Sequence, residues 1–121
     1  MATAWVRKLM EHRQERKRLL DEELKRLVAE LKKMGAQRIL LFGSMAQDKG
    51  DLNSDIDLMV VLGSDLPFIK RLGWLYGELR PRTALDLLAY TPGELARIRH
   101  RPFIRHILQE GKVLYEARPQ G

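Results

Sequence analysis

Cysteine is absent from the 121-residue sequence, and its absence excludes a disulfide framework and a thiolate metal site. The chain also lacks an apolar run of about 18 residues, the length that crosses a bilayer as a helix, and it lacks a signal-peptide core. A Walker-type phosphate loop, G-x-x-x-x-G-K-[ST], does not occur. His12, His100 and His106 do not have the spacing of metal ligands. These absences favour a soluble, cytoplasmic protein with no membrane segment.

Charge is distributed unevenly along the chain. The 22 Lys and Arg residues outnumber the 16 Asp and Glu residues, for a formal net charge of +6. Residues 1–34 carry ten basic and six acidic residues, and residues 97–112 carry five and one, whereas residues 43–66 carry one lysine and five aspartates. Basic flanks around an acidic centre suit an anionic partner held near a cation. The alternative is that the basic segments are solvated helix faces.

The N-terminal part of the chain is predicted to be helical. A helix is expected over residues 19–34, with Gly35 as its stop, because apolar residues recur there every three or four positions. Residues 11–18 contain no apolar side chain, so this stretch is either an exposed helical arm or a frayed tail. We divide the chain into an N-terminal helix or arm, residues 1–34, and a catalytic-type domain, residues 35–121, within a single domain overall.

Strands and helices are predicted to alternate in the rest of the chain. Short apolar runs predict buried strands, and a period of 3.6 residues predicts the helices between them. Strands are expected over residues 38–42, 55–62, 83–90 and 112–116, and helices over residues 67–80 and 92–109, with an interruption at Pro102. Thr91, Pro92 and Glu94 have the pattern of a capping box with proline at the first helical position. The order predicts an α+β (α/β) domain with a small mixed β-sheet flanked by helices.

Two aspartates, Asp55 and Asp57, stand at the start of the second predicted strand. Side chains alternate across a strand, so both project from one face while Ile56 and Leu58 point to the core. Neighbouring carboxylates repel each other and burial adds to the cost, whereas a divalent cation with oxygen ligands relieves both. Taken alone, the pattern more often marks a turn residue followed by an exposed strand residue.

Two further features belong to the same region. Asp86 interrupts an otherwise apolar strand, where aspartate is disfavoured. If that strand lies beside residues 55–62, Asp86 completes a three-carboxylate site for two metal ions; otherwise it is an edge-strand residue that faces solvent. Gly43 and Ser44 follow the first strand, where glycine permits close approach of the backbone and free N–H groups face a phosphate. By itself, Gly-Ser after a strand is a common turn.

The combination of Gly43-Ser44, ten intervening residues, Asp55-x-Asp57 and a third aspartate on a later strand resembles the DNA polymerase β-like nucleotidyltransferase superfamily, in particular its stand-alone minimal nucleotidyltransferases. The similarity covers nearly the whole chain after the first helix. It implies that Gly43 and Ser44 contact the triphosphate of ATP or another nucleoside triphosphate. It also implies that Asp55, Asp57 and Asp86 are catalytic and bind two Mg²⁺ ions. The implied reaction transfers a nucleotidyl group, with AMP from ATP favoured, to a hydroxyl.

The same resemblance implies a protein partner, because minimal nucleotidyltransferases are often encoded beside a HEPN-domain protein. The favoured acceptor is a tyrosine on a HEPN toxin, which would make this chain the antitoxin. One alternative is a non-catalytic binding or scaffold domain with the same fold, which Gln47 and Asp48 favour because many relatives have Arg-Gly there. A weaker alternative is a nucleic-acid binder that uses the basic N-terminal helix and binds in a salt-dependent manner.

Some side chains outside the motif have two interpretations. An arm that ends in Trp5 suits a contact with a partner subunit or with a second copy in a homo-oligomer. Trp74 and Tyr76 are interpreted as packing residues rather than base-stacking platforms. A series of arginines is either solvated surface or a contact for a nucleotide, RNA or an acidic partner; its members are Arg97, Arg99, Arg101 and Arg105.

Overall fold

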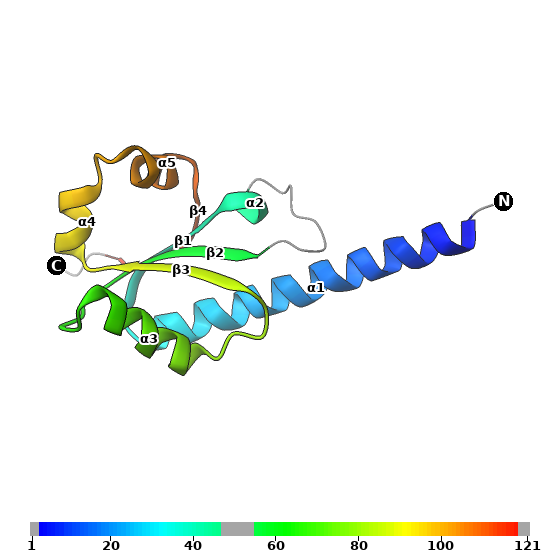
Figure 1. The fold of residues 1–121 in the computed structure, drawn as a ribbon, viewed down its shortest axis with the longest axis horizontal. Helices are drawn as coiled ribbons and strands as arrows, with labels where there is room; N and C mark the ends of the chain where they lie inside the picture. Colours follow the sequence, from blue (N-terminus) through cyan, green and yellow to red (C-terminus); the bar gives the residue numbers. More distant parts are fainter. Residues whose placement is uncertain (1–2, 47–54, 119–121) are drawn as a thin grey trace.

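The computed structural model describes residues 3–46 and 55–118. In chain order its elements are α1 (Thr3–Lys33), β1 (Ala36–Phe42), α2 (Gly43–Ala46), β2 (Ile56–Leu62), α3 (Phe68–Leu79), β3 (Leu85–Tyr90), α4 (Pro92–Ile98), α5 (Pro102–Glu110) and β4 (Lys112–Glu116). The strands form one sheet in the order β3-β2-β1-β4. Only β2 and β3 are parallel, and the other neighbours are antiparallel. The predicted α+β fold with a small mixed sheet is therefore confirmed (Figure 1).

The two faces of the sheet bury two separate clusters. On one face, α1 and α3 pack against the sheet, and the buried residues there include Leu27, Leu31, Ile39, Leu58 and Leu75. On the other face, α5 contributes Ile107 to a smaller cluster with Leu40 and Met59. Because side chains alternate along β2, Asp57 and Met59 share the face that α5 covers.

The predicted long N-terminal helix is confirmed: α1 is one continuous helix of 31 residues, which extends the helix expected over residues 19–34 through the arm before it. The polar stretch at residues 11–18 is therefore a helical arm and not a frayed tail. Ion pairs along the helix explain its stability there: Arg18 pairs with Glu15 three residues before it and with Glu22 four residues after it. Such pairs support helix where no apolar face is buried.

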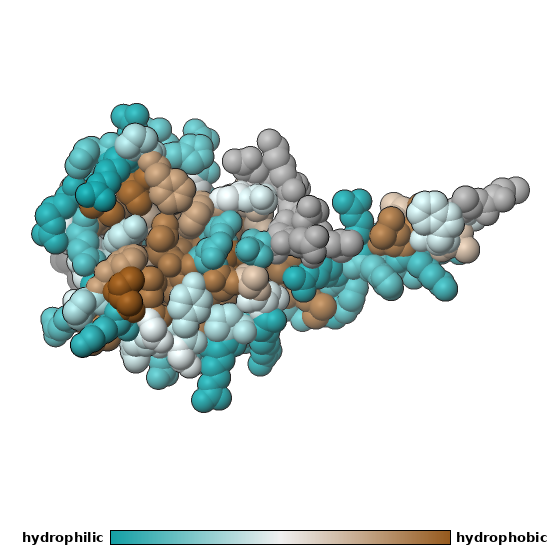
Figure 2. All heavy atoms as spheres, viewed as in Figure 1, coloured by the Kyte–Doolittle hydropathy of each residue, from teal (hydrophilic) through white to brown (hydrophobic). Residues whose placement is uncertain are grey.

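The N-terminal half of α1 extends away from the sheet (Figure 1). Apolar side chains are exposed near its free end, where Figure 2 shows brown surface; they are Trp5, Val6, Leu9 and Met10. Within the described part of the chain, no helix has the length and apolar character needed to cross a membrane.

Arg71 is a buried charge on the inner face of α3, with 1% of its surface exposed. Its guanidinium donates hydrogen bonds to the carbonyls of Ala89 (2.7 Å) and Leu66 (2.8 Å) and to both carboxylate oxygens of Glu94 (2.6 and 3.2 Å). Glu94 also accepts from the backbone N–H of Thr91 in the predicted capping box, which the structure confirms. One network therefore joins α3, β3 and α4.

The ionisation of Glu94 makes part of the stability of this network dependent on pH. Hydrogen bonds from Arg71, then from the Thr91 backbone, lower the pKa of Glu94 from 4.5 to about 2. A carboxyl whose pKa is depressed by folding stabilises the protein above pH 4.5, and this contribution is lost as the pH falls towards 2. We expect a loss of roughly 1.5 kcal/mol from this group between pH 5.5 and pH 2.5, the lower end of what a hydrogen bond to a charged group contributes, because Glu94 is partly exposed.

Urea unfolding followed by circular dichroism at 222 nm measures this pH dependence. Other carboxylates titrate in the same range, so the decisive quantity is the difference between the parent protein and Glu94→Gln at each pH. That difference should shrink as the pH falls from 5.5 to 2.5. A difference that does not change with pH would show that the charge of Glu94 is not what stabilises the network.

Candidate functional site

Two of the three predicted carboxylates face each other on neighbouring strands. Asp57 on β2 pairs in register with Asp86 on β3, so their side chains lie on the same face of the sheet. Asp57 is half-buried and Asp86 is exposed, as expected at an edge strand. Asp55 precedes β2 and is exposed. Asp86 therefore lies beside Asp57, as the predicted pairing of the two strands requires, and it also faces solvent from the edge strand; its role as a metal ligand stays a prediction.

The electrostatics of this pair oppose full ionisation. Burial raises the pKa of Asp57 from 3.8 to about 6, and three further effects add to the shift: a hydrogen bond with Asp86, the charge of Asp86 and the charge of Asp55. Like charges close together disfavour the doubly ionised state, and a nearby cation would reverse this effect. The arrangement therefore attracts either a proton or a positively charged ligand.

Gly43 brings the predicted Gly-Ser turn into contact with Asp57. Phe42, the last residue of β1, pairs with Asp57 across the antiparallel ladder, so Gly43 follows directly beside it. The backbone of Gly43 has a φ of +74°, and a β-carbon there would lie only 2.1 Å from Oδ2 of Asp57. Ser44 follows on the short helix α2 and is exposed. The two halves of the sequence motif, ten residues apart, are thus adjacent in space.

Gly43→Ala should displace the Asp57 carboxylate, and Gly35→Ala provides a matched control. Both glycines have positive φ, +74° and +96°, so alanine strains either backbone by about 1–2 kcal/mol. No atom lies within 4 Å of a β-carbon built at Gly35. We therefore expect similar losses of unfolding free energy, but loss of the magnesium-dependent ATP binding that the sequence resemblance implies only in Gly43→Ala. Urea unfolding and isothermal titration calorimetry measure the two quantities, and unchanged binding in Gly43→Ala would contradict the close contact.

Tyr76 holds the strand that carries Asp86. Its hydroxyl donates to the carbonyl of Leu85 (2.8 Å) and accepts from the N–H of Leu87 (3.1 Å), the two residues that flank Asp86. Burial, and to a smaller extent the charge of Asp86, raises the pKa of Tyr76. The sequence predicted a packing residue here, and the hydroxyl's role was missed because its partners depend on how β3 lies against α3.

The side-chain oxygens at this site meet only part of what a hard cation such as magnesium requires as ligands. Among residues 3–46 and 55–118, no group of three or more His, Asp or Glu side chains is arranged to hold a metal ion. Asp57 and Asp86 nevertheless supply two carboxylates side by side, the ligand type that magnesium takes, and Asp55 adds charge nearby. Gln47 and Asp48, where the sequence departs from the motif of many relatives, lie outside the described residues.

Comparisons with known proteins agree with the fold and the motif. A profile of the family "Polymerase beta, Nucleotidyltransferase" matches residues 22–120. None of the curated proteins matches the chain.

Similar solved structures include a candidate nucleotidyltransferase and chains of toxin-antitoxin complexes. A candidate nucleotidyltransferase from Sulfolobus solfataricus is 17% identical, with a TM-score of 0.54 over 88% of this chain and 86% of that one. A chain of a toxin-antitoxin crystallised with AMP-PNP is 25% identical, with a TM-score of 0.53 over 78% of this chain and 73% of that one. A chain of a mutant MntA-HpeT toxin-antitoxin is 26% identical, with a TM-score of 0.48 over 81% and 72%.

The family profile covers β1 with its Gly-Ser turn, the Asp55-x-Asp57 strand and the strand of Asp86, which are the elements that form the site. The chain therefore belongs to the polymerase β nucleotidyltransferase family.

Proposed function

We propose that this protein is a magnesium-dependent nucleotidyltransferase that transfers AMP from ATP to a hydroxyl group of a protein. The observation that carries the proposal is the packing of the Gly43 backbone against Asp57, which in turn faces Asp86. This contact places a turn suited to phosphate beside a pair of carboxylates suited to a cation. Family membership supports the reaction class, and the site residues support the chemistry.

Each residue of the site has a proposed role. Gly43 and Ser44 contact the triphosphate through backbone N–H groups and the serine hydroxyl. Asp57, Asp86 and Asp55 hold magnesium, which when bound neutralises charge on the phosphates and makes the acceptor hydroxyl more acidic. Asp86 is exposed on the edge strand β3, so it is positioned to receive the proton of the acceptor hydroxyl. The acceptor oxygen forms a bond to the α-phosphorus, and pyrophosphate leaves with the electron pair of the broken bond.

The proposed acceptor is a tyrosine of a HEPN-domain toxin, with this chain as its antitoxin. The related structure with AMP-PNP is a toxin-antitoxin, which supports both a nucleotide substrate and a protein partner. The exposed carboxylate edge at β3 leaves Asp86 accessible to a second macromolecule. The exposed apolar end of α1 offers a further surface for such a partner.

A second candidate is a non-catalytic antitoxin with the same fold, which neutralises its partner by contact alone. Two observations favour it: the described carboxylates do not form a three-ligand metal site, and Gln47-Asp48 replaces the Arg-Gly of many relatives. In this alternative the aspartates are not required for neutralisation.

A transfer assay with α-³²P-labelled ATP separates the two candidates. The purified protein is incubated with magnesium, labelled ATP and a HEPN-domain protein as the proposed partner, and label on that partner is followed after denaturing electrophoresis. The proposal predicts label from α-³²P-ATP but none from γ-³²P-ATP, and no label with Asp55→Asn/Asp57→Asn. If the partner is neutralised equally by that double variant and carries no label with either protein, the non-catalytic alternative is correct.

A further inference from the structure

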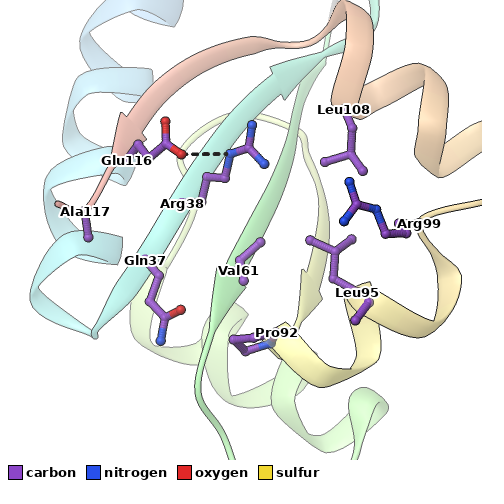
Figure 3. A pocket seen from close by; sticks show the side chains of 10 residues that line it. Gln37, Arg38, Val61, Pro92, Leu95, Arg99, Leu108, Glu116 and Ala117 are labelled. Atoms are coloured by element: carbon purple, nitrogen blue, oxygen red, sulfur yellow. Dashed lines mark ion pairs between the residues drawn. The ribbon is translucent and has the colours of Figure 1, made fainter. Parts of the chain in front are cut away.

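A pocket of about 340 Å³ lies on the α5 face of the sheet, away from the aspartates. Its floor is apolar, formed by Val61, Leu95 and Leu108, and two arginines, Arg38 and Arg99, also line it. Figure 3 shows both guanidinium groups pointing into this space, Arg38 from β1 and Arg99 from the end of α4. The volume is within the range of small-molecule sites.

The backbone of Arg38 is fixed in the sheet, but its guanidinium group does not make all of its hydrogen bonds. Its backbone pairs with Val61 on one side and with Glu116 on the other, so the strand position is fixed by both neighbours. Its Nε is buried and has no hydrogen-bond partner among the described residues. The nearest carboxylate, Oε1 of Glu116, lies 3.9 Å from Nε, which is too far for a hydrogen bond. A buried donor of this kind is costly unless a ligand or water accepts from it.

The charges of the pocket select for an anion. Two guanidinium groups share a small space, and Glu116 is the one carboxylate among the lining residues. The Glu116 side chain is 64% exposed, so solvent weakens its attraction to Arg38. Guanidinium groups bind phosphate with two parallel hydrogen bonds, and a phosphate would satisfy the Nε of Arg38.

This pocket is separate from the carboxylate site. Val61 and Asp57 lie four residues apart on β2 and face the same side, which corresponds to about 13 Å along the strand. A single phosphate group cannot contact both Arg38 and Asp57 at that distance. The apolar side chains that line the pocket, Val61 from β2, Leu95 from α4 and Leu108 from α5, suit an organic body attached to the phosphate.

We propose that the pocket formed by Arg38 and Arg99 binds a small phosphorylated molecule, with the phosphate on the two guanidinium groups and the organic part on Val61, Leu95 and Leu108. The proposal requires no metal and does not depend on transferase activity. The proposal assigns a ligand contact to Arg99, which lies at the end of α4. The sequence alone left this residue with two interpretations, solvated surface or ligand contact.

Nuclear magnetic resonance of the ¹⁵N-labelled full chain tests the proposal through the arginine Nε–H signals. Inorganic phosphate and AMP are titrated in the presence of EDTA, with sodium chloride added to keep the ionic strength constant. We expect saturable shifts of the Arg38 and Arg99 signals, and AMP binding at least three times tighter than phosphate. Arg38→Met and Arg99→Met should each weaken AMP binding at least tenfold. Arg97→Met, which changes an exposed arginine on the same helix, should leave it unchanged.

Three results would each contradict the proposal. Shifts at Arg38 and Arg99 that do not saturate, or that are no larger than those at Arg97, would show that the pocket has no specific anion site. AMP binding that survives Arg38→Met and is lost in Asp55→Asn/Asp57→Asn would place AMP at the carboxylate site instead. Equal affinities for AMP and phosphate would refute the role of the apolar floor.

Discussion

Asp57→Asn should reduce the rate of the proposed AMP transfer by more than about 100-fold and weaken the proposed magnesium-dependent ATP binding at least tenfold. Changes to residues that only support a metal ligand typically cost 10–100-fold, so loss of a direct ligand should cost no less. Asparagine keeps the shape of the side chain but removes its charge, which is the property the proposed cation requires. Isothermal titration calorimetry with a non-hydrolysable ATP analogue, with and without magnesium, measures the binding.

The same substitution should stabilise the protein, and this separates lost function from lost folding. Burial and the neighbouring carboxylates raise the pKa of Asp57 to about 6, so the folded state is destabilised by ionisation of this group at higher pH. In EDTA at pH 8 we expect Asp57→Asn to increase the unfolding free energy by about 1–2 kcal/mol, allowing for partial exposure. The gain should fall as the pH drops through 6 and disappear below about pH 3, because Asp57 is then protonated in both the folded and the unfolded state.

Asp65→Asn is the matched control, since Asp65 is exposed and lies outside the site. It should change neither ATP binding nor stability by a measurable amount. If Asp57→Asn keeps full magnesium-dependent binding, the carboxylate pair is not the cation site. If Asp57→Asn instead lowers the unfolding free energy, then ionisation of Asp57 does not destabilise the folded state.

Arg71→Met should cost about 3–5 kcal/mol of unfolding free energy, a large part of the stability of a typical domain. The substitution leaves the carbonyls of Ala89 and Leu66 without their donor and the carboxylate of Glu94 without its partner. The methionine fills much of the space, so the loss reports on the polar network and not on a cavity. Urea unfolding followed by circular dichroism measures it.

Arg18→Met is the control: it tests whether replacing any ion-paired arginine costs as much unfolding free energy as Arg71→Met. Arg18 pairs with two carboxylates, yet its side chain is 54% exposed, so the change should cost far less unfolding free energy than Arg71→Met. Arg71→Met/Glu94→Gln should recover part of the loss, because the uncompensated carboxylate is removed. A loss within 1 kcal/mol of that of Arg18→Met would mean that the buried network contributes little.

Local patterns account for most of what could be predicted. The spacing of apolar residues indicated α3 and the core part of α1, and Thr91, Pro92 and Glu94 indicated the start of α4. The alternation of side chains placed Asp57 opposite the core face of β2. These predictions succeed because helix and strand periods act over a few residues and depend little on the rest of the chain.

Long-range contacts account for what could not be predicted. Arg71 lies on the inner face of α3, three residues after Phe68 and four before Leu75, a position that predicts an apolar residue. Its partners come from a loop, from strand β3 and from helix α4, up to 23 residues away. No local pattern indicates that a charge at that position is satisfied.

The sequence by itself determined the elements, the family motif and the identity of the candidate site residues, because these depend on residue type and short spacing. Only the tertiary structure decided that Asp57 lies in register with Asp86, that Gly43 packs against the carboxylate of Asp57, and that Arg38 and Arg99 line one pocket. The physical reason is that strand register and helix docking are set by the packing of two buried clusters on opposite faces of the sheet. That packing involves residues far apart in the chain, and a shift by one position would turn Asp57 towards the core.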